Sequence, residues 1–166
     1  LIQGKVFGKR FKTEIKNNFE KISLKLLNTG IDLELNFKKD KEKNSKVGIF
    51  KSKILNTNIK FDFEYNKKIL KINNSYLRSK NISFSNESVI IFDPFLNIYS
   101  EIDIDEINTL IFKTIDLDKL LKSKNILKKI NIENKINFNS KKFNQTLVDK
   151  LNLKLDLEYG RVNYLK

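Results

Sequence analysis

Apolar residues recur at every second position along most of this chain. The pattern is clearest at Leu153, Leu155 and Leu157, and it returns over residues 31–37 and 59–65. A period of two places the apolar side chains of a β-strand on one face and the polar side chains on the other. Many such strands in succession predict a sheet with one apolar and one polar face.

Short polar turns separate most of the expected strands, and connections this short join antiparallel neighbours. The fold class predicted is mainly β, with a long curved antiparallel sheet that is either an open groove or partly rolled. A closed β-sandwich, which buries the apolar face on itself, is the alternative. One or two short helices are expected in addition, over residues 116–129 and 141–150.

The chain is interpreted as a single segment, 1–166, of a larger β-groove protein, because it begins with Leu1 and contains no Met. Its expected parts are the following: first strands at 1–37, a charged loop at 38–46, a β-meander at 47–104, a helix-containing insertion at 105–150 and terminal strands at 151–166. Within the meander, Asn86 and Glu87 are expected to form a turn between strands at 80–85 and 88–92.

The net charge of +13 calls for an explanation. Such a charge suggests nucleic acid or an anionic membrane as partner. Lys outnumbers Arg by 30 to 3, however, whereas proteins that read phosphates and bases favour Arg. Lys, Ile, Asn and Phe, whose codons are rich in A and T, make up more than half of the chain. A solvated polar face in an A/T-rich genome is therefore favoured, and no nucleic-acid partner is expected.

The residue inventory excludes several chemistries. Without His or Cys the chain has no disulfide, no His-based catalytic triad and no nitrogen- or sulfur-ligated metal site. The acidic residues Glu101, Asp103 and Asp105 alternate with Ile102 and Ile104, which places them on a polar strand face. No apolar run approaches 18 residues, so the sequence predicts no membrane-spanning helix. We expect neither catalysis nor a cofactor or metal.

The candidate functional residues are apolar positions of three strongly alternating strands. We expect them to line a hydrophobic groove, with ordinary core packing as the alternative. These residues are Ile59, Phe61, Phe63, Ile98, Ile102, Ile104, Leu153, Leu155 and Leu157.

Two stretches together resemble the AsmA-like family of Gram-negative envelope proteins, the bridge-like lipid transfer proteins of the TamB and YhdP type. The first is GIFKSKILNTNIKFDFEYNKKILKINNSYLRSKNISFSNESVIIFDPFLNIYSEIDI at 48–104, which is similar to the repeating strand blocks of that family. The second is FNQTLVDKLNLKLDLEYGRV at 143–162, which resembles a short helix followed by a strand that ends in Gly.

The resemblance implies a location and an activity. Members of the family are anchored in the inner membrane by an N-terminal helix, which here would lie outside this segment, and they extend through the periplasm. It implies that phospholipid or another acyl-chain lipid is the partner, bound or conducted along a hydrophobic groove in support of outer-membrane lipid transport or assembly. The family supplies no catalytic residues. A structural or scaffolding β-sandwich without ligand is the alternative function, and a basic nucleic-acid-binding domain is a less favoured third.

Overall fold

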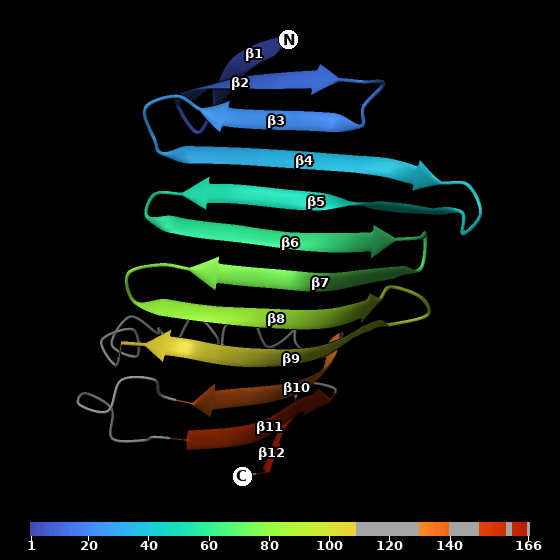
Figure 1. The fold of residues 1–166 in the computed structure, drawn as a ribbon, viewed down its shortest axis with the longest axis vertical. Helices are drawn as coiled ribbons and strands as arrows, with labels where there is room; N and C mark the ends of the chain where they lie inside the picture. Colours follow the sequence, from blue (N-terminus) through green and yellow to red (C-terminus); the bar gives the residue numbers. More distant parts are fainter. Residues whose placement is uncertain (109–129, 140–149, 159–160, 166) are drawn as a thin grey trace.

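The structure is a computed structural model that describes residues 1–108, 130–139, 150–158 and 161–165. These residues form one twelve-stranded sheet in which the strands lie side by side in sequence order (Figure 1). The strands are β1 (Ile2–Val6), β2 (Lys9–Lys16), β3 (Lys21–Leu26), β4 (Ile31–Asp40), β5 (Ser45–Ile54), β6 (Thr57–Tyr65), β7 (Ile69–Arg78), β8 (Ile82–Ile91), β9 (Leu96–Ile107), β10 (Ile130–Asn139), β11 (Lys150–Glu158) and β12 (Arg161–Leu165).

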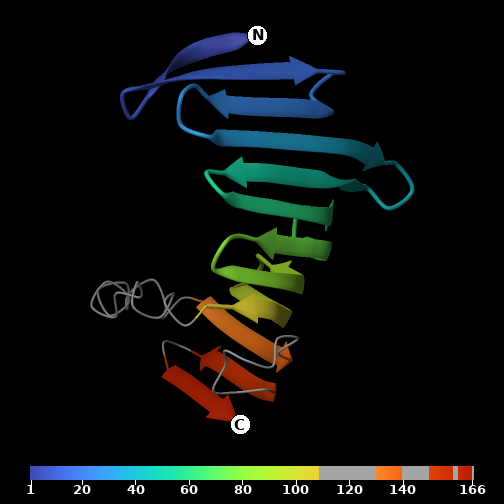
Figure 2. The same cartoon turned by 60° about the vertical axis from the view of Figure 1, so that its left-hand side comes forward.

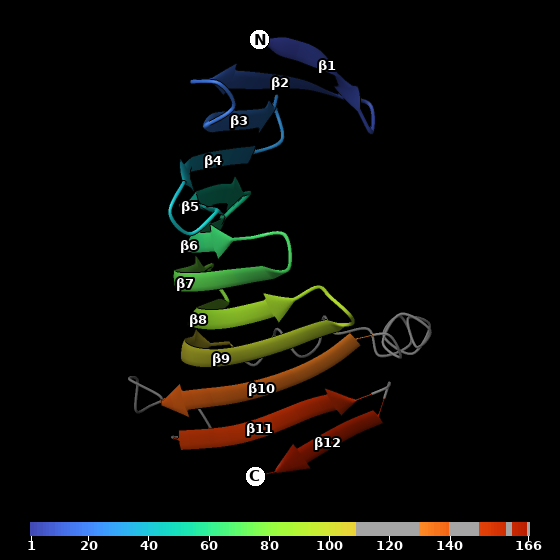
Figure 3. The same cartoon turned by 90° about the vertical axis from the view of Figure 1, so that its right-hand side faces the viewer.

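The sheet is open, because β1 and β12 lie at its two opposite edges (Figure 1). At the usual spacing between strands of about 4.8 Å, twelve strands extend over roughly 50 Å. Figures 2 and 3 show the strand direction turning progressively from β1 to β12, so that the sheet is twisted along its length. The predicted long, curved sheet is confirmed. The described residues form a single layer and not the alternative sandwich.

One strand pair departs from the predicted antiparallel order. β9 and β10 run parallel, with Ile98 opposite Ile132 and Ile104 opposite Phe138, whereas all other neighbours in the sheet are antiparallel. Parallel neighbours need a long connection that returns the chain to the same end of the sheet. Residues 108–129 between the two strands are long enough to make that return.

A bulge in β7 corrects the phase of the apolar alternation. Leu70 and Ile72 share one face of β7, but Leu77 comes five residues after Ile72 and would point the other way in a regular strand. The register with β8 shifts between Ile72 and Ser75, and Asn74 adopts a φ of 48°. Asn tolerates this left-handed conformation better than most residues. The extra residue brings Leu77 back to the apolar face, opposite Phe84.

Gly48 lies where the backbones of β4 and β5 leave no room for a side chain on β5. It lies opposite Phe37 on one side and Phe63 on the other. A Cβ atom at position 48 would overlap the carbonyl oxygen of Asn36 and would lie 2.7 Å from Cβ of Phe37. Glycine is therefore required here for contact between backbones, although its φ is not unusual.

Several predicted boundaries are wrong. β4 and β5 extend into the expected loop at 38–46, since β4 reaches Asp40 and β5 begins at Ser45. Asn86 and Glu87 are not a turn, because both pair within β8, which runs unbroken from Ile82 to Ile91. β9 and β10 likewise extend into the expected insertion at 105–150. The two expected helices, at 116–129 and 141–150, fall almost wholly outside the described residues, and Lys150 itself begins β11.

The substitution Gly48→Ala should destabilise the fold, because the added methyl group meets backbone atoms that cannot move aside without separating β4 from β5. We expect a loss of roughly 1–3 kcal/mol in the free energy of unfolding, typical of overpacking, measured by chemical denaturation.

Ser52→Ala is the matched control on the same face of β5. The Ser52 hydroxyl is buried and has no hydrogen-bond partner among the described residues, so its removal should not destabilise the fold. Equal stability of Gly48→Ala and wild type would contradict this packing.

Candidate functional site

All nine predicted groove residues lie on the same face of the sheet, which we call the apolar face. Cross-strand pairing connects Ile59 on β6 through Leu77 and Phe84 to Ile104 on β9. On the far side of β9, Ile102 pairs with Ile136, and Ile136 pairs with Leu153. The remaining predicted residues alternate in phase with these, so the set extends from β6 to β11, roughly 24 Å at the usual strand spacing.

The apolar face has little cover from the described residues. Their only apolar side chains less than a tenth exposed are Phe138 and Leu157, at 7% and 8%. The other eight predicted groove residues are half-buried, as expected for side chains packed against neighbouring strands with no second layer above them. A sheet with one apolar face ordinarily buries that face against another layer. Within the described residues, the apolar face is therefore a surface that is open to an occupant.

An aromatic hollow lies on this face over β4 to β7. It has a volume of about 320 Å³ and is lined by Leu35, Phe37, Lys46, Phe50, Phe61, Phe63, Tyr65 and Leu70. The rings of Phe50 and Phe61 stack with centroids 4.8 Å apart, and Phe63 meets Phe61 edge-on at 6.5 Å. The name aromatic hollow is used below for this depression together with the eight residues that line it.

Gly48 accounts for the hollow. It pairs with Phe37 on β4 and with Phe63 on β6, and its nearest neighbours on the same face of β5 are Lys46 and Phe50. Large side chains therefore surround a position that has no side chain. The Lys46 ammonium lies 5.1 Å from the centre of the Phe37 ring, at the end of the hollow. The same glycine that allows β4 and β5 to approach thus leaves an apolar depression with a cation at its border.

A small polar group interrupts the apolar face over β8 to β10. Ser88, Ser100 and Asn134 are successive cross-strand partners, and Asn86 lies beside them. Two hydrogen bonds link these side chains: Ser100 donates to Asn134, and Ser88 donates to Asn86 at 2.9 Å. Apolar rows continue on both sides, with Ile98 and Ile132 in one and Ile102 and Ile136 in the other. The group is a self-contained polar patch within the apolar face.

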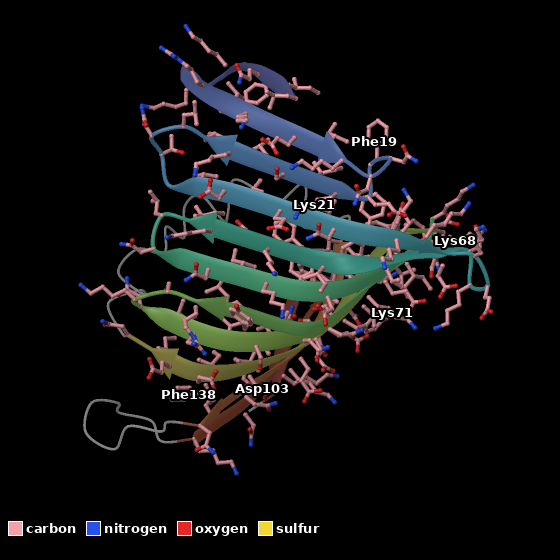
Figure 4. The ribbon with its side chains drawn as sticks, turned by 45° about the horizontal axis from the view of Figure 1, so that its top comes forward. Phe19, Lys21, Lys68, Lys71, Asp103 and Phe138 are labelled. Carbon is pink, nitrogen blue, oxygen red and sulfur yellow. The ribbon has the colours of Figure 1, made fainter. Side chains whose placement is uncertain are left out.

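The opposite face carries the charges and is called the polar face. Lys25 and Asp32 form a cross-strand ion pair at 3.5 Å, and Lys21 meets Glu34 at 3.1 Å. Figure 4 shows side chains standing out from both faces of the sheet. A hollow of about 760 Å³ on the polar face is lined by residues of both charge signs, including Lys51, Lys60 and Glu34. Mixed charges with ion pairs are typical of a solvated sheet face.

Three groups on the polar face have shifted pKa values. Hydrogen bonds and charge attraction from Lys12 and Lys16 lower the pKa of Glu14 from its ordinary 4.5 to about 2. A hydrogen bond from Asn36, together with Lys21, lowers the pKa of Glu34. Contact with Asp156 raises the pKa of Lys154. All three shifts favour the charged form through neighbours on the same or the adjacent strand, and none of the three groups lies in the aromatic hollow.

In the part of the chain that the structure describes, no group of three or more acidic side chains is arranged to hold a metal ion. Nor does that part contain a helix long and apolar enough to cross a membrane. No family model, no curated protein and no solved structure matches this chain.

The sequence pattern predicts only some of the residues that line the aromatic hollow. Phe61 and Phe63 were among the predicted groove residues, whereas Leu35, Phe37, Phe50 and Leu70 were not. Leu35 and Phe37 carried a usable signal, since they alternate with Leu33 in the same way as the chosen strands. Phe50 carried a weaker one, because Val47 and Ile49 are apolar at the opposite phase of β5. The depression itself depends on pairing Gly48 with Phe37 and Phe63, and register is not readable from one strand.

Glu14→Gln should reduce stability at neutral pH but not at acid pH. Because the pKa of Glu14 is lowered on folding, its stabilising effect is present above about pH 4.5 and is lost as the pH falls towards 2. Denaturation midpoints of wild type and variant, measured from pH 7 to pH 2, should differ at pH 7 and converge at the acid end. Glu42→Gln removes the same charge from an exposed turn and serves as the control. A Glu14→Gln difference that persists unchanged at pH 2 would contradict the role of the ionised carboxylate.

Proposed function

We propose that this chain binds acyl chains of lipid along its apolar face, without catalysis. The observation that carries the proposal is the open apolar face from β6 to β11, which contains all nine predicted groove residues. A contiguous apolar surface rimmed by polar residues is typical of an interaction or ligand site. An extended sheet face suits a long flexible chain, because backbone hydrogen bonds are satisfied within the sheet and only side chains meet the ligand.

The energy available to an acyl chain on this face is large. Each methylene group removed from water contributes roughly 0.8 kcal/mol, so ten of them contribute about 8 kcal/mol before the chain's own ordering cost. The rows of half-buried side chains at Ile98, Ile102 and Leu155 lose exposure at the same time. Covering the face therefore stabilises both ligand and sheet.

The wider setting follows from the resemblance to AsmA-like proteins. On that basis we propose a segment of a longer envelope protein, held at the inner membrane by an anchor outside this segment and located in the periplasm. Its partner is phospholipid or another acyl-chain lipid, which it binds or conducts in support of outer-membrane lipid transport or assembly. The open, twisted sheet is the shape that such a groove requires.

A structural module without ligand is the second candidate. The described strands leave one edge of β1 and one edge of β12 without a partner, as a stretch of a longer sheet would. On this account the apolar face meets other protein, and no lipid accompanies the chain.

Phe61→Glu should weaken binding of an acyl chain, because it puts a carboxylate against the stacked ring of Phe50 in the aromatic hollow. Lys60→Glu is the matched control, since Lys60 is the neighbouring residue and lies on the polar face. The measurement is the dissociation constant for lysophosphatidylcholine, whose head carries no net charge, by titration with native mass spectrometry. We expect a loss of at least about tenfold for Phe61→Glu, equivalent to 1.4 kcal/mol, and little change for Lys60→Glu.

Leu155→Glu, on β11, is a second variant of the apolar face, made in case Phe61→Glu does not fold. Circular dichroism and the unfolding midpoint of each variant are measured first, and only folded variants are compared. Equal weakening by changes on both faces would contradict binding at the apolar face. A wild-type protein that binds no lysophosphatidylcholine would favour the structural module.

A further inference from the structure

A lysine-lined hollow lies directly beside the aromatic hollow, at the end of the sheet formed by the β4–β5 and β6–β7 turns. Its volume is about 520 Å³, and its lining includes Lys39, Lys43, Lys46, Lys67 and Lys68. No acidic residue is among its described lining residues. Figure 4 shows Lys68 at the end of the sheet where the β4–β5 turn projects. We call these five residues the lysine cluster.

The lysine cluster carries a surplus of positive charge. Of the acidic groups nearby, Asp93 forms an ion pair with Lys68 at 3.2 Å. Asp40 accepts hydrogen bonds from the backbone of the turn, and Glu64 accepts one from Ser45 at 3.3 Å. Asp40 is thus bonded to the backbone of Lys43 and not to its ammonium group, and Glu42 is exposed beside Lys43 in the same turn. Within the described residues, the ammonium groups of Lys39, Lys43, Lys46 and Lys67 form no ion pair with these carboxylates.

Two of the lysines repel each other across the sheet. Lys39 and Lys46 are directly opposed on β4 and β5, and like charges in that position destabilise a strand pair. An anion bound between these strand ends would relieve the repulsion. Lys51 and Lys60 are opposed in the same way on the polar face, but Glu34 lies across from Lys51 there, whereas no acidic residue is among the described residues that line the lysine hollow.

The two hollows share Lys46 and Tyr65, so the apolar and cationic sites are contiguous. Lys46 covers the Phe37 ring with its ammonium group 5.1 Å from the ring centre, which marks the boundary between them. A molecule lying across that boundary would have its chain among Phe50, Phe61 and Phe63 and its polar end among lysines.

We propose that the ligand of this region is an anionic amphiphile, with its negatively charged head at the lysine cluster and its acyl chain in the aromatic hollow. This inference rests on the proposed binding of acyl chains and adds the charge and the orientation of the ligand. A head with no net charge gains nothing from the cluster, whereas each lysine near an anionic head strengthens binding.

The test compares lysophosphatidylglycerol with lysophosphatidylcholine of the same acyl chain, below their critical micelle concentrations and at low salt. Wild type should bind the anionic lipid at least roughly tenfold more tightly, since each nearby lysine contributes on the order of 1 kcal/mol. The triple variant Lys39→Gln, Lys43→Gln, Lys67→Gln, whose residues line the lysine hollow but not the aromatic hollow, should lose that preference and keep its affinity for lysophosphatidylcholine. The matched control is Lys51→Gln, Lys53→Gln, Lys60→Gln, which removes the same charge from the polar face of neighbouring strands and should keep the preference.

The outcomes separate this inference from the proposed function. Binding of both lipids with equal affinity by wild type overturns the inference and leaves acyl-chain binding intact. Equal loss of preference in both triple variants also overturns it, because net charge alone would then explain the effect. Binding of neither lipid overturns the proposed function and the inference with it. Inorganic phosphate is titrated alone as a further arm, and affinity equal to that of the anionic lipid would show a free-anion site that needs no acyl chain.

Discussion

The rest of the structure depends on the need to cover the apolar face. The hydrogen-bonded ladder satisfies the backbone of the inner strands, from β2 to β11, but it does not bury the Ile, Leu and Phe side chains that alternation places on one face. Only Phe138 and Leu157 are nearly buried among them. Because burial of apolar area is the main favourable contribution to folding, a molecule that covered this face would stabilise the fold as well as bind to it.

The aromatic hollow shows how one residue can serve fold and site together. Gly48 lets β4 and β5 approach, and the space it leaves is surrounded by Phe37, Phe50 and Phe63. Lysines lie near the ends of these strands and in the turns that join them, so the apolar depression opens onto a positively charged turn region. The polar face carries ion pairs of ordinary type, which keep the opposite side of the sheet solvated.

The fold class and the face of each candidate residue could be predicted, because a period of two determines which side chains share a strand face. Other features depend on relations between strands. The bulge at Asn74 returns Leu77 to the apolar face, and nothing within β7 itself shows where the alternation must shift. Asn86 and Glu87 have turn-like composition but lie within β8, where Asn86 joins the polar patch around Ser88. The parallel direction of β10 depends on the long connection that follows β9. The depression at Gly48 depends on register, which one strand's sequence does not determine.

Chemical labelling of single cysteines tests most directly whether the apolar face is open. The chain contains no Cys, so Ile98→Cys on the apolar face and Tyr99→Cys on the polar face each introduce a unique thiol on β9. In lipid-free protein both should react with a water-soluble maleimide at similar rates, and added lysophospholipid should slow the reaction only at position 98. An unreactive thiol at position 98 in the folded, lipid-free protein, beside a reactive one at 99, would show that protein already covers this face and would contradict the account.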